Sequence, residues 1–211
     1  MEIKIIYDNT SSRDDLTADW GFACLVEAYG RKILFDTGAR GDILLSNMEK
    51  MGIKPADIEM VFISHSHWDH TGGLDDFIKA QPVTLYVPAS YKPEIPDIEI
   101  IPVSESLKID ENIYSTGELM GIEQSLVINT DRGTVVIAGC AHSDVKNILD
   151  AASLVGSPRA LIGGLHGFAQ YNLLASLEMV CPTHCTQHIA DIKAAHPDNY
   201  IEGGAGRILS F

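Results

Sequence analysis

The stretch Ile63-Ser64-His65-Ser66-His67-Trp68-Asp69-His70-Thr71-Gly72-Gly73 concentrates three histidines and one aspartate in six consecutive positions. Residues 59–63 are mostly apolar and lie between polar neighbours, which predicts a short buried strand ending just before the first histidine. Because side chains alternate along an extended backbone, His65 and His67 point to the same side and can bind one metal ion. Asp69 and His70 follow where the chain turns, so they point elsewhere and can bind a second ion.

The pattern H-x-H-x-D-H after an apolar strand resembles the signature of the metallo-β-lactamase fold superfamily. Three further segments resemble that superfamily: Ile33-Leu34-Phe35-Asp36-Thr37-Gly38, Gly139-Cys140-Ala141-His142 and Pro182-Thr183-His184-Cys185-Thr186. The last two together most resemble the subgroup named for a dihydropterin ribofuranosyl-aminobenzene phosphate synthase. The resemblance extends over nearly the whole chain, and it implies a fold, a metal centre and a class of reaction.

The order of the predicted elements indicates an α/β protein. Strands followed by helices occur twice, and each time a run of potential ligands stands at a strand end. The resemblance implies a four-layer αββα sandwich, in which two mixed sheets pack face to face, helices cover the outside and the metals lie at one edge. A chain of 211 residues is long enough for a sizeable core, so residues 1–211 are expected to form a single domain. Four prolines between residues 88 and 102 predict a loop there.

Composition argues against several classes of function. The net charge of −14 disfavours binding to a phosphate backbone, so nucleic acid is not expected as the main partner. No apolar run reaches the roughly 18 residues that span a bilayer. The N-terminus has the pattern of a strand rather than a signal peptide, so we expect a cytoplasmic protein without membrane association. In that setting the four cysteines are expected to be reduced thiols.

Two more site residues are assigned through the resemblance. It implies that His184 completes the binding of the second ion together with Asp69 and His70. It also implies that Asp36 sits beneath the metals and hydrogen-bonds to their ligands. From the sequence alone, a cap for the following helix is an equally good interpretation of Asp36, because a carboxylate that closes a buried strand needs partners.

The segment around Cys140 departs from the commonest pattern of the superfamily. Most relatives carry an isolated histidine between the first motif and a later Gly-Asp pair, but here no histidine lies between His70 and His142, and Cys140 replaces the aspartate. His142 can supply the missing imidazole to the first ion, while Cys140 either bridges the ions or packs nearby as a small core residue. Alternatively the site is asymmetric, with one ion weakly held.

His166 follows another predicted strand, and we expect it at the cleft as a proton donor or anion contact, with a structural histidine as the alternative. A long polar loop covers residues 8–19. In the superfamily such a loop commonly borders the substrate cleft, which would bring Asp8, Asn9 and Trp20 close to that cleft. The alternative is a solvated connection.

The ligand types predict a metal-dependent hydrolase. Imidazoles with one carboxylate suit two divalent ions, zinc above all, with manganese or iron as alternatives. A metal-bound hydroxide, oriented by Asp69, would attack a phosphoester, ester, thioester or related small molecule, and the dications would allow an anionic substrate.

Three other functions remain open at this point. The subgroup's name implies a transferase-like condensation at a phosphorylated ribosyl compound. Iron-dependent oxidoreductases also occur in the superfamily, although the diiron members typically have glutamate at the position of His67. A metal-bound sensor without turnover is the third, because fold and motif do not determine reaction type. The sequence leaves the oligomeric state undetermined.

Overall fold

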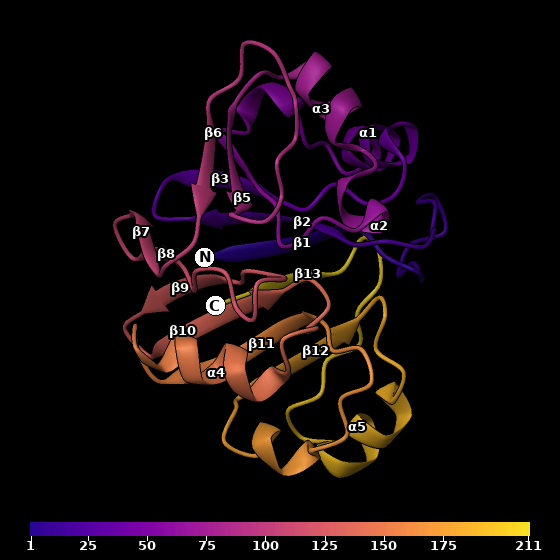
Figure 1. Cartoon of the computed structure of the whole chain (residues 1–211). Helices are drawn as coiled ribbons and strands as arrows, with labels where there is room; N and C mark the ends of the chain where they lie inside the picture. Colours follow the sequence, from indigo (N-terminus) through magenta and orange to yellow (C-terminus); the bar gives the residue numbers. More distant parts are fainter.

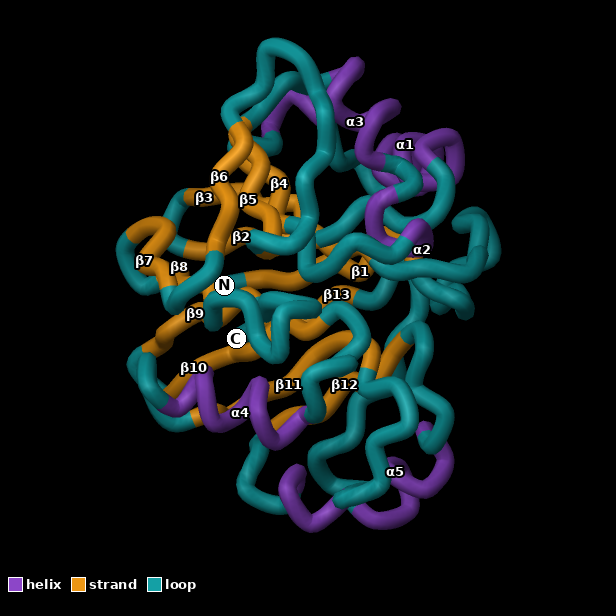
Figure 2. The backbone as a smooth tube through the Cα atoms, viewed as in Figure 1, coloured by secondary structure: helices purple, strands orange, loops and turns teal.

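Two β-sheets lie face to face, with helices on their outer sides, in the computed structural model of residues 1–211 (Figure 1). Figure 2 shows the strands gathered in the middle of the molecule and the helices at its two extremes. Each sheet contains both parallel and antiparallel pairs, so the expected αββα sandwich with two mixed sheets is confirmed.

The first sheet has seven strands and contains both ends of the chain. Its order is β13 (Ile208–Ser210), β1 (Glu2–Tyr7), β2 (Ala23–Ala28), β3 (Arg31–Phe35), β4 (Met60–Phe62), β5 (Thr84–Pro88) and β6 (Ile100–Val103). The strands from β3 to β6 run parallel to one another. Its helices are α1 (Gly41–Lys50), the single-turn α2 (Trp68–Thr71) and α3 (Leu74–Ala80), with a 3₁₀ turn at Pro55–Asp57.

The second sheet has six strands. Its order is β12 (Met179–Thr183), β11 (Pro158–Gly164), β10 (Gly133–Ala138), β9 (Leu126–Thr130), β8 (Ile113–Ser115) and β7 (Leu107–Asp110). Only β10, β11 and β12 are mutually parallel. The helices of this half are α4 (Val145–Ser153) and α5 (Ile189–Ala195), with a 3₁₀ turn at Tyr171–Leu174.

Alternation along the strands builds three apolar layers. On β3, Ile33 and Phe35 face the core between the sheets, whereas Leu34 faces α1 and α3. On β10, Ile137 likewise faces the inter-sheet core and Val136 faces α4. The inter-sheet core contains 18 buried residues drawn from both sheets, so burial of apolar surface holds the sheets together.

The parallel strands of both sheets end at the same edge of the sandwich. In the first sheet β3 ends before Asp36 and β4 before the histidine-rich stretch. In the second sheet Cys140 follows β10, His166 follows β11 and His184 follows β12. Gln124 links the halves here, because its backbone N–H donates to Ser64 O and its side-chain amide to Ile63 O.

One local prediction was wrong at its end. The proline-rich segment was expected to remain a loop to residue 102, but residues 100–103 pair with β5 as strand β6. Pro102 is tolerated because β6 is an edge strand, where a residue without an N–H can face away from the ladder. Among the helices, none has both the length and the apolar character needed to span a membrane.

Candidate metal centre

The histidine-rich stretch begins one residue after the buried part of β4. His65 is 1% exposed, and its Nε2 lies 3.1 Å from His67 Nδ1. The two rings therefore turn toward a common point, as the alternation of side chains predicted. Beyond His67 the chain enters α2, which carries Asp69 and His70 in a different direction.

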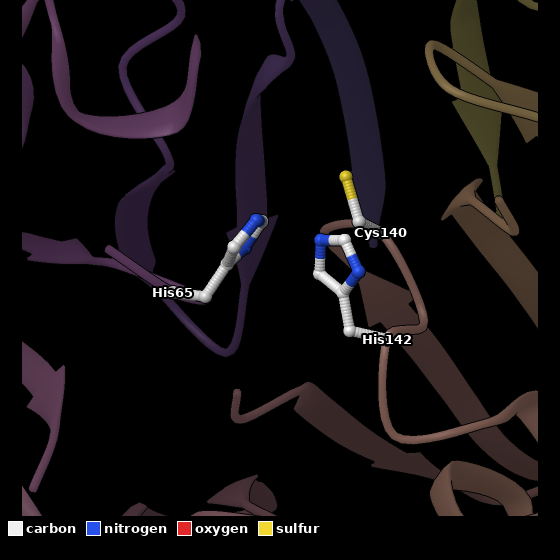
Figure 3. Close-up of side chains that lie close together, drawn as sticks. All are labelled: His65, Cys140 and His142. Atoms are coloured by element: carbon white, nitrogen blue, oxygen red, sulfur yellow. The ribbon is translucent and has the colours of Figure 1, made fainter. Parts of the chain in front are cut away.

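His142, from the second sheet, completes a group around that point. Its ring centroid lies 4.9 Å from that of His65 and 4.8 Å from that of His67. Ligand atoms of His65, Cys140 and His142 all lie within 4.8 Å of one another. Figure 3 shows the imidazoles of His65 and His142 opposite each other, with their planes at 72°, and the side chain of Cys140 next to His142.

A second group lies beside the first. Ligand atoms of His70, Cys140 and His184 also lie within 4.8 Å of one another. Asp69 belongs with them, because its Oδ2 lies 3.2 Å from His184 Nε2. The structure thus brings together all seven candidate ligands, in two groups that each draw residues from both sheets.

The sulfur of Cys140 belongs to both groups. It lies 3.1 Å from His70 Nε2 and also within the His65 and His142 group. A ligand shared by two ions would occupy such a position, whereas a cysteine packed in an apolar core would not lie beside four histidines. The role of Cys140 as a ligand stays a prediction.

A glycine allows the two halves to approach this closely. A Cβ placed on Gly139 would lie 2.1 Å from Ser64 Oγ and 3.1 Å from His65 Nδ1. Any larger residue before Cys140 would therefore collide with the residues that carry the first ligands.

Buried polar residues orient the ligands from behind. Asp36 is fully buried; its Oδ1 accepts the Ser64 backbone N–H and its Oδ2 lies 2.7 Å from His70 Nδ1. The carboxylate thus leaves His70 Nε2 free to face the site. Helix α1 begins only at Gly41, so Asp36 does not cap it.

Residues of the polar loop, and Trp20 directly after it, hold His184 and Asp69 in position. This is expected of a loop that borders the cleft. Asn9 Oδ1 lies 2.9 Å from His184 Nδ1, and the His184 backbone N–H donates to Asp8 Oδ1. Trp20 Nε1 donates to Asp69 Oδ2 at 2.8 Å. The first and last ligand motifs are therefore held by residues of the N-terminal loop.

Sequence reasoning did not identify Ser64 or recognise how Glu123 acts. Ser64 connects Asp36 to His65, with its Oγ 2.7 Å from Asp36 Oδ2 and 2.9 Å from His65 Nδ1. Glu123 Oε1 accepts hydrogen bonds from Ser143 N and Oγ, and so steadies the turn that carries His142. The position of Ser64 next to a candidate ligand was a usable signal. The sequence indicates Glu118 and Glu123 only as outside candidates for the site, and it does not pair Glu123 with Ser143.

Burial determines the protonation of the imidazoles. It lowers the pKa of both His65 and His70 far below the usual range, and neighbouring histidines reinforce the effect. Burial opposes ionisation of Asp69, but the hydrogen bond with His184 outweighs it and lowers the pKa of that carboxyl. Neutral imidazoles and an ionised carboxylate are the forms that bind metals.

Backbone strain concentrates at this edge of the sandwich. Nine residues other than glycine have positive φ, and five of them belong to the site or its turns: Asp36, Ala141, Asp144, His166 and His184. Such conformations cost roughly 1–3 kcal/mol each and persist where the surrounding structure enforces them. Their concentration here indicates a site that is organised for function.

A cavity of about 370 Å³ opens beside the first group. His142 and His166 both line it, with ring centroids 5.0 Å apart. His166 is exposed, as expected for a residue at the cleft, and it also contacts the Cys185 thiol. The other lining residues include Phe168, Val145 and Gln170, and none is lysine or arginine.

Comparison with known proteins gives consistent similarities. The family model described as "Metallo-beta-lactamase superfamily" matches residues 21–184. The 7,8-dihydropterin-6-methyl-4-(β-D-ribofuranosyl)-aminobenzene-5′-phosphate synthase of Methanocaldococcus jannaschii is 24% identical, over 90% of this chain and 88% of its own. An uncharacterized protein of the same organism is also 24% identical, over 98% of this chain and 99% of its own. The crystal structure of Tm1679, a metal-dependent hydrolase of the beta-lactamase superfamily, has a TM-score of 0.82 and 25% identity, and the match covers 100% of this chain and 99% of that one.

Proposed function

Because the chain belongs to the metallo-β-lactamase superfamily, we propose that it is a hydrolase with two divalent ions at this edge of the sandwich. His65, His67 and His142 would hold the first ion, and Asp69, His70 and His184 the second. Cys140 would bridge them. The observation that carries the proposal is the shared position of the Cys140 sulfur in both ligand groups.

The nitrogen and sulfur atoms of the proposed ligands are placed to bind metal ions. His142 Nε2 is buried without a hydrogen-bond partner, and His184 Nε2 lies 3.2 Å from Asp69 Oδ2, another proposed ligand atom. Buried polar atoms are rarely left unsatisfied, so His142 Nε2 calls for a ligand. Imidazole and thiolate together favour zinc over manganese, which prefers oxygen. A bound ion of this kind lowers the pKa of a coordinated water toward about 7.

The residues around the ligands supply the remaining parts of a hydrolytic reaction. Asp69 would bind its ion and accept a hydrogen bond from the attacking water, while Trp20 holds the carboxylate through Oδ2. His166 would donate the proton that the leaving group needs, because its exposed ring lines the cavity and its centroid lies 5.0 Å from that of His142. The strained backbone at His166 keeps that ring in place.

The cavity supports a small molecule as substrate. Its volume of about 370 Å³ is at the lower end of typical ligand pockets. Half of its ten lining residues are hydrophobic, which suits the acyl or leaving group of an ester or thioester. The charged oxygens of a phosphoester would have to be bound by the metal ions and by His166, because no lysine or arginine lines the cavity.

A second candidate is condensation at a phosphorylated ribosyl compound. It is favoured by the similarity to the archaeal synthase over 90% of this chain. In that reaction the same ligands would place the ions on a departing phosphate group instead of water.

Metal analysis of anaerobically purified protein, followed by a panel of esters, thioesters and phosphodiesters, tests the proposal. We expect about two zinc ions per chain and turnover of at least one substrate class. The His67→Ala variant should lose the first ion and turnover, whereas His188→Ala, a partly exposed histidine outside the centre, should retain both. Absence of metal after metal-replete expression would refute the centre. Full zinc content without hydrolysis would favour the synthase reaction.

A further inference from the structure

Cys185 is the one thiol beside the metal centre that the proposed reaction does not use. Its Sγ lies 3.9 Å from the backbone oxygen of Cys140, to which it donates a hydrogen bond. Cys185 is 9% exposed and Cys140 3% exposed, and Cys140 directly precedes Ala141 and His142, which line the cavity. No disulfide joins them, and both are free cysteines.

The two cysteines meet only because of a glycine between them. Cys140 follows β10 and Cys185 follows β12, and β11 separates these strands in the sheet. Alternate strands of a sheet are roughly 9–10 Å apart, whereas a disulfide needs Cα atoms roughly 4.4–6.8 Å apart. At the end of β11, a Cβ on Gly164 would lie 2.7 Å from Cys185 Sγ and 3.3 Å from Cys140 Cα. Both cysteines therefore border the position that a Gly164 side chain would occupy, at the end of β11. Because glycine has no side chain, the two cysteines can approach each other there.

We propose that Cys140 and Cys185 form a reversible disulfide when the protein meets hydrogen peroxide, and that this bond withdraws the Cys140 sulfur from both metal ions. The proposal rests on the proposed centre, in which Cys140 is the shared ligand. It adds a redox modification site that disables the centre without removing any histidine.

The reaction proceeds in two balanced steps. The Cys185 thiol, the more exposed of the two, attacks one peroxide oxygen, so that the O–O bond breaks, a sulfenic acid forms and water leaves. The Cys140 sulfur then attacks Cys185 Sγ, forming the S–S bond and breaking the S–O bond, and the departing oxygen leaves as a second water with the remaining proton. Each molecule of peroxide is reduced by two electrons, and dithiothreitol supplies two electrons to reverse the change.

The other two cysteines provide an internal comparison. Cys24 and Cys181 are fully buried in the apolar core between the sheets, away from the cleft. Burial raises the pKa of Cys181 to about 12, so it stays an unreactive thiol. Oxidation is therefore expected at one pair of cysteines and not at the other.

Zinc-loaded protein treated with hydrogen peroxide tests the proposal through two readouts. Peptide mass analysis should find the Cys140 and Cys185 peptides linked, with the loss of two hydrogens. A chromogenic chelator should report zinc release that dithiothreitol and added zinc reverse. Cys185→Ala should release zinc at least about tenfold more slowly and give no linked peptide, whereas the matched core variant Cys181→Ala should behave as the natural protein does.

Two results would overturn the proposal. One is oxidation of Cys140 to sulfinic acid in the natural protein without any linked peptide. The other is zinc release from Cys185→Ala at the rate of the natural protein. The peptide readout needs no variant and no bound metal, so it decides the disulfide even if a variant fails to fold. A protein that hydrolyses nothing would refute the proposed function and leave this result unaffected.

Discussion

The first sheet supplies its ligands from one place, whereas the second sheet assembles its ligands from several. Four candidate ligands lie within six consecutive positions after β4: His65, His67, Asp69 and His70. Cys140, His142 and His184 come from the ends of β10 and β12, with β11 between these strands. The first set depends on local geometry, and the second depends on how strands pair and how the sheets pack.

The difference shows how each half is held in position. The local set rests on a buried carboxylate, Asp36, reached through strand pairing between β3 and β4. The dispersed set rests on distant contacts, such as Asn9 with His184, which are 175 positions apart in the chain. Errors of packing should therefore affect the second set first.

Replacing one proposed ligand from each half tests whether the two halves contribute equally to metal binding and turnover. Of the substitutions considered, these should have the largest effect. His65→Ala and His142→Ala both remove an imidazole from the proposed first ion. Each should lose about one ion and more than about 100-fold in kcat/KM, because even residues behind the ligands typically contribute 10–100-fold. Metal analysis and kinetics check this. If His142→Ala keeps full metal content, the second half contributes less than proposed.

Substitutions behind the ligands should sharpen the comparison between local and distant support. Asp36→Asn removes the charge that faces His70 in a fully buried site, so zinc affinity should fall by roughly 10–100-fold. Asn9→Ala should weaken zinc binding by less than about tenfold, because Asp8 still holds the backbone of His184. Competition with a chelator measures both affinities. Equal losses would remove the distinction between the two kinds of support.

Gly139→Ala tests the approach of the two halves directly. The added methyl would meet Ser64 Oγ at 2.1 Å, so the variant should lose roughly 1–3 kcal/mol in the free energy of unfolding. Gly167→Ala is the matched control, since its nearest contact, Gln187 Oε1, would be 3.8 Å away. Urea unfolding of both variants decides the matter, and an unchanged Gly139→Ala would mean that the halves can separate at little cost.

Cys140→Asp should have the smallest effect and would make the second half resemble the commoner superfamily pattern. A carboxylate can occupy the shared position, so the variant should still bind metal. Its preference should move from zinc toward manganese by about tenfold, because manganese prefers oxygen to sulfur. The ratio of the two metals bound from an equimolar mixture measures this shift. An unchanged ratio would show that the sulfur does not contact the ions.

Much of the fold was predictable because its signals are periodic and local. The alternation along β3 and β10, and the ligand runs at strand ends, indicated an α/β protein without knowledge of any contact. The layered sandwich itself was predicted only through resemblance, since a strand's periodicity does not say which sheet it joins. The edge strand β6 was missed because its pairing with β5 outweighed the signal of Pro102.

The sequence by itself determined the first set of candidate ligands, since alternation along extended backbone points His65 and His67 to the same side. It also left two questions open: whether Asp36 caps a helix, and whether Cys140 packs in the core. Only the tertiary structure placed Asp36 on His70 and the Cys140 sulfur within both ligand groups. The physical reason is that these contacts join residues 34 and 70 positions apart, which only the pairing of strands and the packing of sheets can bring together.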